Sequence, residues 1–199
     1  LHLCHHNLET IETNNYNSRN AKHDLLLEVC MAAYYEGESI KTHHPQHQGT
    51  NPDSKICTEL ARSFADIGDI VRGRDLFRGN DKEKDQRKKL QQNLKKIFGK
   101  IHGGLKNGEL KKRYKKDKDP NFFQLREDWW TANRETVWKA ITCSKELKDK
   151  RYFRATCGDS GSPYTARDKC RCDDKPSGGK PGDVNVVPTY FDYVPQFLR

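Results

Sequence analysis

Seven cysteines are the residues whose chemistry most constrains this protein. They are spread along the whole sequence: Cys4, Cys30, Cys57, Cys143, Cys157, Cys170 and Cys172. None of them forms a Cys-x-x-Cys pair, and the last two make a lone Cys-x-Cys, so the spacing does not match a zinc module. Cysteines without metal spacing predict disulfides formed in an oxidising compartment. Because seven is an odd number, we expect at least one partner to lie outside the chain.

A glycine- and serine-rich motif is the one candidate for nucleophilic chemistry. Residues 158–163 read Gly-Asp-Ser-Gly-Ser-Pro, close to the Gly-Asp-Ser-Gly-Gly-Pro loop of trypsin-like proteases, with Ser160 as the nucleophile. Hydrolysis also requires a histidine base held by a buried carboxylate. None of the eight histidines lies in an Ala-Ala-His-Cys setting, and the preceding sequence has helical patterns. We therefore predict a turn here, no enzymatic activity and no cofactor.

Histidines gather in two small groups that deserve a test as metal ligands. They are His2, His5 and His6, and then His43, His44 and His47. Imidazoles three or four residues apart on a helix can share an ion. Pro45 interrupts the second group, and no carboxylates are regularly interleaved with either. We expect exposed loop histidines and no metal site.

Positive charge is concentrated in the middle of the chain. Residues 72–118 hold 18 Lys or Arg and 6 Asp or Glu, a net charge of +12, whereas the whole chain carries +9. Two clusters contain the candidate binding residues: Arg87, Lys88, Lys89, Lys95 and Lys96, and then Lys111, Lys112, Arg113, Lys115 and Lys116. On a helix, positions 88, 89, 92, 95 and 96 share one face, so four lysines would project together.

Such a surface attracts polyanions, because binding releases their condensed counterions. Sulfated glycosaminoglycans would suit an extracellular protein and nucleic acid an intracellular one; the cysteines favour the sugar and a chain that binds no nucleic acid. A solvated helix face that only maintains solubility is the alternative, and the sequence leaves it open.

Apolar periodicity predicts long helices that would position these residues. We expect helices over residues 20–40, from Asn51 to about 71, over 82–101 and over 121–148, with a break at 41–53, a long cross-linked loop at 158–189 and a new helix near Tyr190. Trp129, Trp130 and Trp138 follow helical spacing, which favours core packing over a ligand platform.

The composition sets limits on the core. Hydrophobic residues make up 33% of the chain, charged residues another 33%, and the mean hydropathy is -1.05. No apolar run approaches the ~20 residues that span a bilayer. These values predict a mostly helical, disulfide-stapled domain, and any membrane attachment would come from an anchor elsewhere in a parent chain. Because the sequence begins at Leu1 without a methionine and stops within an apolar run, we expect it to be a fragment of a longer chain.

Five segments carry a recognisable pattern: residues 61–75, 123–134, 137–143, 152–157 and 192–199. They closely resemble the Duffy-binding-like alpha domain, which forms the head of the erythrocyte membrane protein 1 adhesins of malaria parasites. The segments run in family order and are spread over essentially the whole chain. The resemblance implies a cysteine-rich, mostly helical fold in three subdomains. Residues 1–50 would end the first subdomain and supply its first helix, 51–157 would form the helical second subdomain, 158–189 the cross-linked loop, and 190–199 the start of the third.

The resemblance also implies disulfide partners. Related domains of erythrocyte-invasion ligands suggest a bridge between Cys57 and Cys157, and the same likeness pairs Cys30 with Cys143. Cys4 would then pair upstream of Leu1, and Cys170 and Cys172 with cysteines beyond Arg199.

Family likeness implies a role in cell adhesion, antigenic variation and virulence. The parent would be a single-pass membrane protein on the extracellular face of the infected erythrocyte. Expected partners are host cell-surface receptors: heparan sulfate-type glycans, complement receptor or blood-group carbohydrates, with rosetting as the outcome. The alternative is a structural and antigenic head whose receptor affinity lies in flanking segments.

Overall fold

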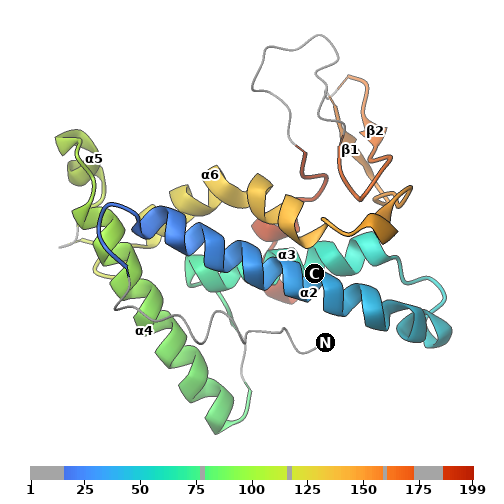
Figure 1. The fold of residues 1–199 in the computed structure, drawn as a ribbon, viewed down its shortest axis with the longest axis horizontal. Helices are drawn as coiled ribbons and strands as arrows, with labels where there is room; N and C mark the ends of the chain where they lie inside the picture. Colours follow the sequence, from blue (N-terminus) through green and yellow to red (C-terminus); the bar gives the residue numbers. More distant parts are fainter. Residues whose placement is uncertain (1–15, 77–78, 116–117, 159–160, 173–185) are drawn as a thin grey trace.

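The computed structural model describes residues 16–76, 79–115, 118–158, 161–172 and 186–199. In these residues five α-helices and one small antiparallel sheet are arranged as shown in Figure 1. The elements are α2 (Ala21–Thr50), α3 (Ile56–Arg72), α4 (Asp81–Gly103), α5 (Gly108–Arg113), α6 (Phe123–Ile141), β1 (Ala155–Cys157) and β2 (Tyr164–Thr165). The expectation of a mostly helical, disulfide-linked fold is confirmed.

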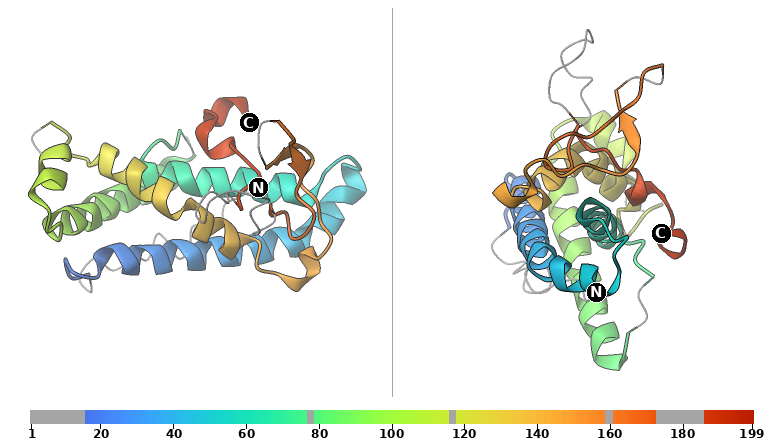
Figure 2. Two further views of the ribbon diagram at one scale, coloured as in Figure 1. Left: turned by 90° about the horizontal axis from the view of Figure 1, so that it is seen from above. Right: turned by 90° about the vertical axis from the view of Figure 1, so that its right-hand side faces the viewer.

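The core forms where α2, α3 and α6 run along the long axis of the molecule (Figure 2). Phe64 of α3 is fully buried, and its ring centroid lies 5.2 Å from that of Trp130 and 5.1 Å from that of Trp138. Offset and edge-to-face aromatic pairs at this separation add to the burial of apolar area. The tryptophans are therefore core residues, as predicted.

Two glycines allow the helices to approach closely. A Cβ atom on Gly37 of α2 would lie 2.2 Å from the carbonyl oxygen of Ile141, and one on Gly68 of α3 would lie 2.8 Å from the Trp130 ring. Contacts this short do not occur, so both positions require a hydrogen in place of a side chain. The α2–α6 and α3–α6 interfaces depend on this spacing.

The four predicted helices exist, but several of their boundaries differ. The expected break at 41–53 is wrong, because α2 continues through Pro45 to Thr50. Proline removes one hydrogen bond from a helix without ending it when the neighbouring bonds persist. The next helix begins at Ile56 and not at Asn51, and α6 ends at Ile141 before a short 3₁₀ turn at Lys145–Leu147.

Two further elements were not predicted correctly. The short helix α5 was missed because it buries no side chain and so has no apolar period. In place of a new helix near Tyr190, the chain forms two 3₁₀ turns, η3 (Phe191–Tyr193) and η4 (Gln196–Leu198).

The disulfides differ from those implied by family likeness. Cys57 pairs with Cys170, with Cα atoms 5.5 Å apart, and Cys157 pairs with Cys172, with Cα atoms 5.4 Å apart. The expected Cys57–Cys157 bridge is therefore wrong, and so are the expected external partners of the last two cysteines. The β1–β2 hairpin turns the chain back and brings the Cys-x-Cys segment beside both partners. Closing the 113-residue loop contributes about 4–5 kcal/mol in the chain-entropy model.

The expected bridge between Cys30 and Cys143 is also absent, and both are free cysteines. Helix geometry explains why. Ile141 packs against Gly37, and Ser144 lies 3.4 Å from the Lys41 ammonium, so Cys143 stands beside residues 37–41 of α2. Cys30 precedes Gly37 by two helical turns, which is about 10 Å along the axis. A disulfide tolerates at most about 7 Å between Cα atoms. Cys4 lies outside the described residues.

The C-terminal segment is fastened to the helices by a buried ionic network. The Asp192 carboxylate, fully buried, accepts hydrogen bonds from the indole nitrogen of Trp130 at 3.0 Å and from the guanidinium of Arg134 at 2.8 and 2.9 Å. Arg72 donates to the Asp192 backbone carbonyl. Arg199 donates to the carbonyl of Phe191 at 2.8 Å and forms ion pairs with two α3 carboxylates. Residues 186–199 are therefore part of the folded body.

Alkylation of the native protein will distinguish the cysteines. We expect exposed Cys143 to react first. Cys30 will react more slowly because burial raises the pKa of its thiol and leaves little thiolate at neutral pH. The cysteines at 57, 157, 170 and 172 will react only after reduction. A non-reducing peptide map that linked Cys57 to Cys157, or Cys30 to Cys143, would contradict the structure.

A substitution at Gly37 will test the α2–α6 contact. Gly37→Ala forces a methyl group against the Ile141 carbonyl, and such overpacking lowers the free energy of unfolding by roughly 1–3 kcal/mol. Gly49→Ala in the same helix is the matched control, because nothing lies within 4 Å of its added Cβ. It is expected to be neutral or to stabilise by up to about 1 kcal/mol, since alanine favours helix. Urea unfolding measures both, and equal effects would contradict the packing.

Candidate functional site

Helix α4 carries the first basic cluster and begins with a strong N-terminal cap. The Asn80 side chain accepts a hydrogen bond from the Glu83 backbone, and the Glu83 side chain accepts one from the Asn80 backbone. This reciprocal capping box satisfies two donors that the first turn would otherwise leave free. Buried residues in α4 begin only at Leu90, so the preceding turns extend away from the core (Figure 1).

Four of the predicted lysines share the outer face of α4. Lys88, Lys89, Lys95 and Lys96 are all exposed, and so is position 92 between them. Leu94 and Ile97 lie on the opposite side of the helix and are buried. None of the four lysines forms an ion pair with a described residue. The predicted face therefore exists as a strip of positive charge that no described acidic residue pairs.

Arg87 does not belong to this strip. Its side chain is only 11% exposed and pairs with Asp75, itself 9% exposed, at 3.2 Å between Nη1 and Oδ2. The pair links the start of α4 to the segment that follows α3. Arg72 was likewise counted in the basic segment, but it is 1% exposed and pairs with Asp69. Both arginines stabilise the fold, so the free charge is smaller than the sequence count.

The second cluster lies on and after α5. Lys111, Lys112, Arg113 and Lys115 are exposed, whereas Lys116 lies outside the described residues. Arg113 forms an ion pair with Asp128 of α6 at 2.8 Å, which partly neutralises it. The same carboxylate accepts a 2.6 Å hydrogen bond from Tyr114. Partial burial, with a further contribution from Asp128, raises the pKa of that phenol.

The structure places both clusters on one edge of the molecule. Helix α5 follows directly beyond the C-terminal end of α4, at the edge remote from the β1–β2 hairpin (Figure 1). We call Lys88, Lys89, Lys95, Lys96, Lys111, Lys112 and Lys115 the basic edge. A strip of lysines along consecutive helices suits an extended, flexible polyanion better than a small one, because charges are distributed along its length.

The other candidate residues are placed as follows. Ser160 lies outside the described residues, and Gly158, the first residue of its motif, has a φ of 83°. His2, His5 and His6 also lie outside. His43, His44 and His47 are on helix α2 and not in a loop, so that expectation is corrected. Across the part of the chain that is described, no group of three or more His, Cys, Asp or Glu is placed to hold a metal ion.

Sequence reasoning missed the buried arginines of α3 and α6. Arg126 is 2% exposed, donates to the Val71 and Ile70 carbonyls and to Gln91, and has its pKa lowered to about 10, mainly by burial. Arg134 binds Asp192. Their side chains look like ordinary surface charges in the sequence; their positions on the apolar stripe of α6 were the available signal.

In the described ranges, no helix is long and apolar enough to cross a membrane.

The fold and its surface define a disulfide-linked helical domain with a basic edge. The model of the Duffy binding domain matches residues 1–199, so the chain belongs to the Duffy binding domain family. Among curated proteins no relative matches.

Solved structures agree with this assignment. The chain is 43% identical to the NTS-DBL1(alpha-1) domain of Plasmodium falciparum membrane protein 1 (PfEMP1) from the varO strain, with a TM-score of 0.71, covering 99% of this chain and 40% of that one. An ICAM-1-binding PfEMP1 DBLbeta domain is 32% identical, with a TM-score of 0.66 and coverage of 99% and 39%.

A second DBLbeta domain, solved bound to human ICAM-1, is also 32% identical, with a TM-score of 0.60 and coverage of 73% and 32%. The chain thus spans about 40% of the length of the first two related structures.

The assignment of Arg87 to the fold predicts different outcomes for neighbouring substitutions. Arg87→Ala leaves the nearly buried Asp75 carboxylate without this partner and is expected to lower the free energy of unfolding by roughly 2–4 kcal/mol. Lys88→Ala, one residue along, removes an exposed charge and should change it by less than about 0.5 kcal/mol. Thermal or urea unfolding measures both. If both substitutions have equally small effects, the Arg87–Asp75 pair does not stabilise the fold.

Proposed function

We propose that this chain is part of an adhesion domain, presented on the outer face of the infected erythrocyte, that binds host cell-surface receptors. The proposal that the receptor includes a glycan rests on the basic edge. The α4 lysines of this edge are exposed, and no described residue pairs with them. A sulfated glycosaminoglycan of the heparan sulfate type supplies the matching extended negative charge. Family membership supports adhesion, and two PfEMP1 DBLbeta relatives are described as binding ICAM-1.

The sugar is favoured over nucleic acid by the two disulfides, which form in oxidising compartments. Adhesion through such a glycan would account for binding of infected cells to uninfected cells, including rosetting. Because the related structures are more than twice as long as this chain, a structural and antigenic role with receptor affinity in flanking segments is the competing proposal.

Heparin binding tests the glycan proposal. Changing Lys88, Lys89, Lys95 and Lys96 together to Ala is expected to weaken heparin affinity at least about tenfold, since each lysine at a polyanionic surface is worth roughly 1 kcal/mol. The dependence of affinity on salt concentration should also become shallower, because fewer counterions are released. Surface plasmon resonance at several salt concentrations measures both quantities.

The matched control removes the same charge elsewhere. Lys22, Lys145, Lys148 and Lys150 are also exposed, and their combined change to Ala lowers the net charge by the same four units. The control should lose much less affinity than the α4 variant. If the two variants lose affinity equally, only overall charge matters and the basic edge is not the binding surface.

A further inference from the structure

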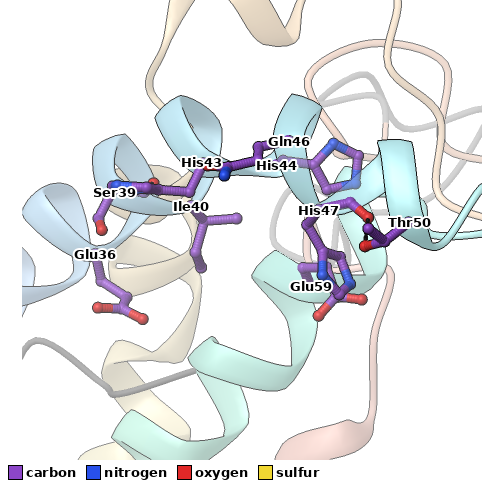
Figure 3. Close-up of a pocket in the computed structure, with 9 residues that line it drawn as sticks. All are labelled: Glu36, Ser39, Ile40, His43, His44, Gln46, His47, Thr50 and Glu59. Carbon is purple, nitrogen blue, oxygen red and sulfur yellow. Dashed lines mark hydrogen bonds between the residues drawn. The ribbon is translucent and has the colours of Figure 1, made fainter.

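A pocket of about 480 Å³ opens between the last turns of α2 and the first turns of α3. It exists because α2 continues past Pro45 while the connecting residues 51–55 carry the chain back to begin α3 at Ile56. The described residues that line it are Glu36, Ser39, Ile40, His43, His44, Gln46, His47, Thr50 and Glu59 (Figure 3). Its volume falls within the range of small-ligand sites, about 300–1,000 Å³.

The lining of this pocket is acidic although the protein is basic, and Arg62, just outside the lining, forms an ion pair with Glu59 at 3.2 Å. The chain carries +9, yet the described lining contains two carboxylates and no lysine or arginine. Both carboxylates belong to buried residues, Glu36 at 3% exposure and Glu59 at 8%. They come from different helices, so the pocket is not a run of acidic residues on one surface. A concave, acidic site with low-dielectric walls focuses negative potential on its interior.

Hydrogen bonds hold both carboxylates in place, and those of Glu59 leave one of its oxygens as an acceptor. Ser63 of α3 donates to Glu36 Oε1 at 2.8 Å across the helix interface. Ser54 and Arg62 both donate to Oε1 of Glu59, at 3.3 and 3.2 Å. All the hydrogen bonds that Glu59 makes with described residues therefore use one oxygen, and Oε2 is left to accept from a ligand.

Three histidines lie at the rim of the site. His43 Nδ1 lies 2.7 Å from the Ser39 carbonyl and so donates to it, and Nε2 is the nitrogen of that ring that this bond does not use. His43 and His47 are exposed, whereas His44 is half-buried and contacts the Ser54 hydroxyl at 3.3 Å. The described lining thus places carboxylate oxygens, imidazole nitrogens and hydroxyl groups around Ile40, the one apolar side chain among them.

We propose that this pocket binds an alkylammonium group, carried either by a lysine side chain of a protein partner or by a free polyamine. An ammonium group brings three donors and a positive charge, which match the carboxylates in charge-assisted hydrogen bonds. The methylene chain of either ligand would pack on Ile40. A sulfated glycan is repelled by the same carboxylates, so the pocket and the basic edge select ligands of opposite charge.

The test titrates the chain with N-acetyl-lysinamide, with spermidine, and with the neutral isostere N-acetyl-norleucinamide. Binding is followed by NMR through the imidazole signals of His43 and His47. We expect both amines to shift these signals and the isostere to leave them unchanged. Tighter binding of spermidine assigns the site to free polyamines, and tighter binding of the lysine derivative assigns it to a protein side chain. Equal shifts from the isostere, or no shift from either amine, would overturn the proposal.

Variants connect the shifts to the pocket. Glu36→Gln keeps an acceptor for Ser63 and, combined with Glu59→Gln, should weaken amine binding at least fivefold. Asp85→Asn removes an exposed carboxylate from α4 and should leave binding unchanged. Ser39→Trp fills the pocket without changing charge and should abolish binding even if the glutamine variant folds poorly. Unchanged affinity in a folded Ser39→Trp protein would place the amine elsewhere.

Discussion

The buried carboxylate of Asp192 connects the C-terminal segment, residues 186–199, to the helices. It belongs to the C-terminal segment, but its hydrogen-bond donors, Trp130 and Arg134, belong to α6. Since an isolated buried charge is costly, the guanidinium and the indole must be in place for the segment to dock. Trp130 in turn packs on Phe64 and closes over Gly68. The same network therefore fixes the C-terminal segment, the orientation of α6 and its contact with α3.

Covalent links support the opposite end of the assembly. Cys57 at the start of α3 is joined to Cys170, and Cys157 at the end of β1 is joined to Cys172. A chain with only 33% hydrophobic residues gains a modest core, and cross-links compensate by restricting the unfolded state. With the helices fixed at both ends, the outer face of α4 is left exposed to solvent. The charges are also separated in space. Lysines follow α4 and α5, whereas Glu36 of α2 and Glu59 of α3 line the pocket between those two helices.

The sequence predicted the features that depend on local periodicity. Spacing in α3 and α4 identified both helices, and the exposed lysines at 88, 89, 95 and 96 followed from the buried Leu94 and Ile97. Features set by tertiary contact could not be predicted in this way. Whether Arg87 is free depends on Asp75, and whether Cys57 meets Cys157 or Cys170 depends on how the β1–β2 hairpin turns. The pocket depends on α2 continuing through Pro45, which local propensity argues against.

A double-mutant cycle at Arg134 and Asp192 tests most directly whether their ion pair fixes the C-terminal segment. Urea unfolding would compare Arg134→Gln, Asp192→Asn and the double variant. Each single change is expected to cost roughly 3–5 kcal/mol, because it leaves a buried charge unpaired. The double variant should cost little more than either, which corresponds to a coupling energy of at least about 2 kcal/mol. Additive losses, with a coupling below about 0.5 kcal/mol, would contradict the account.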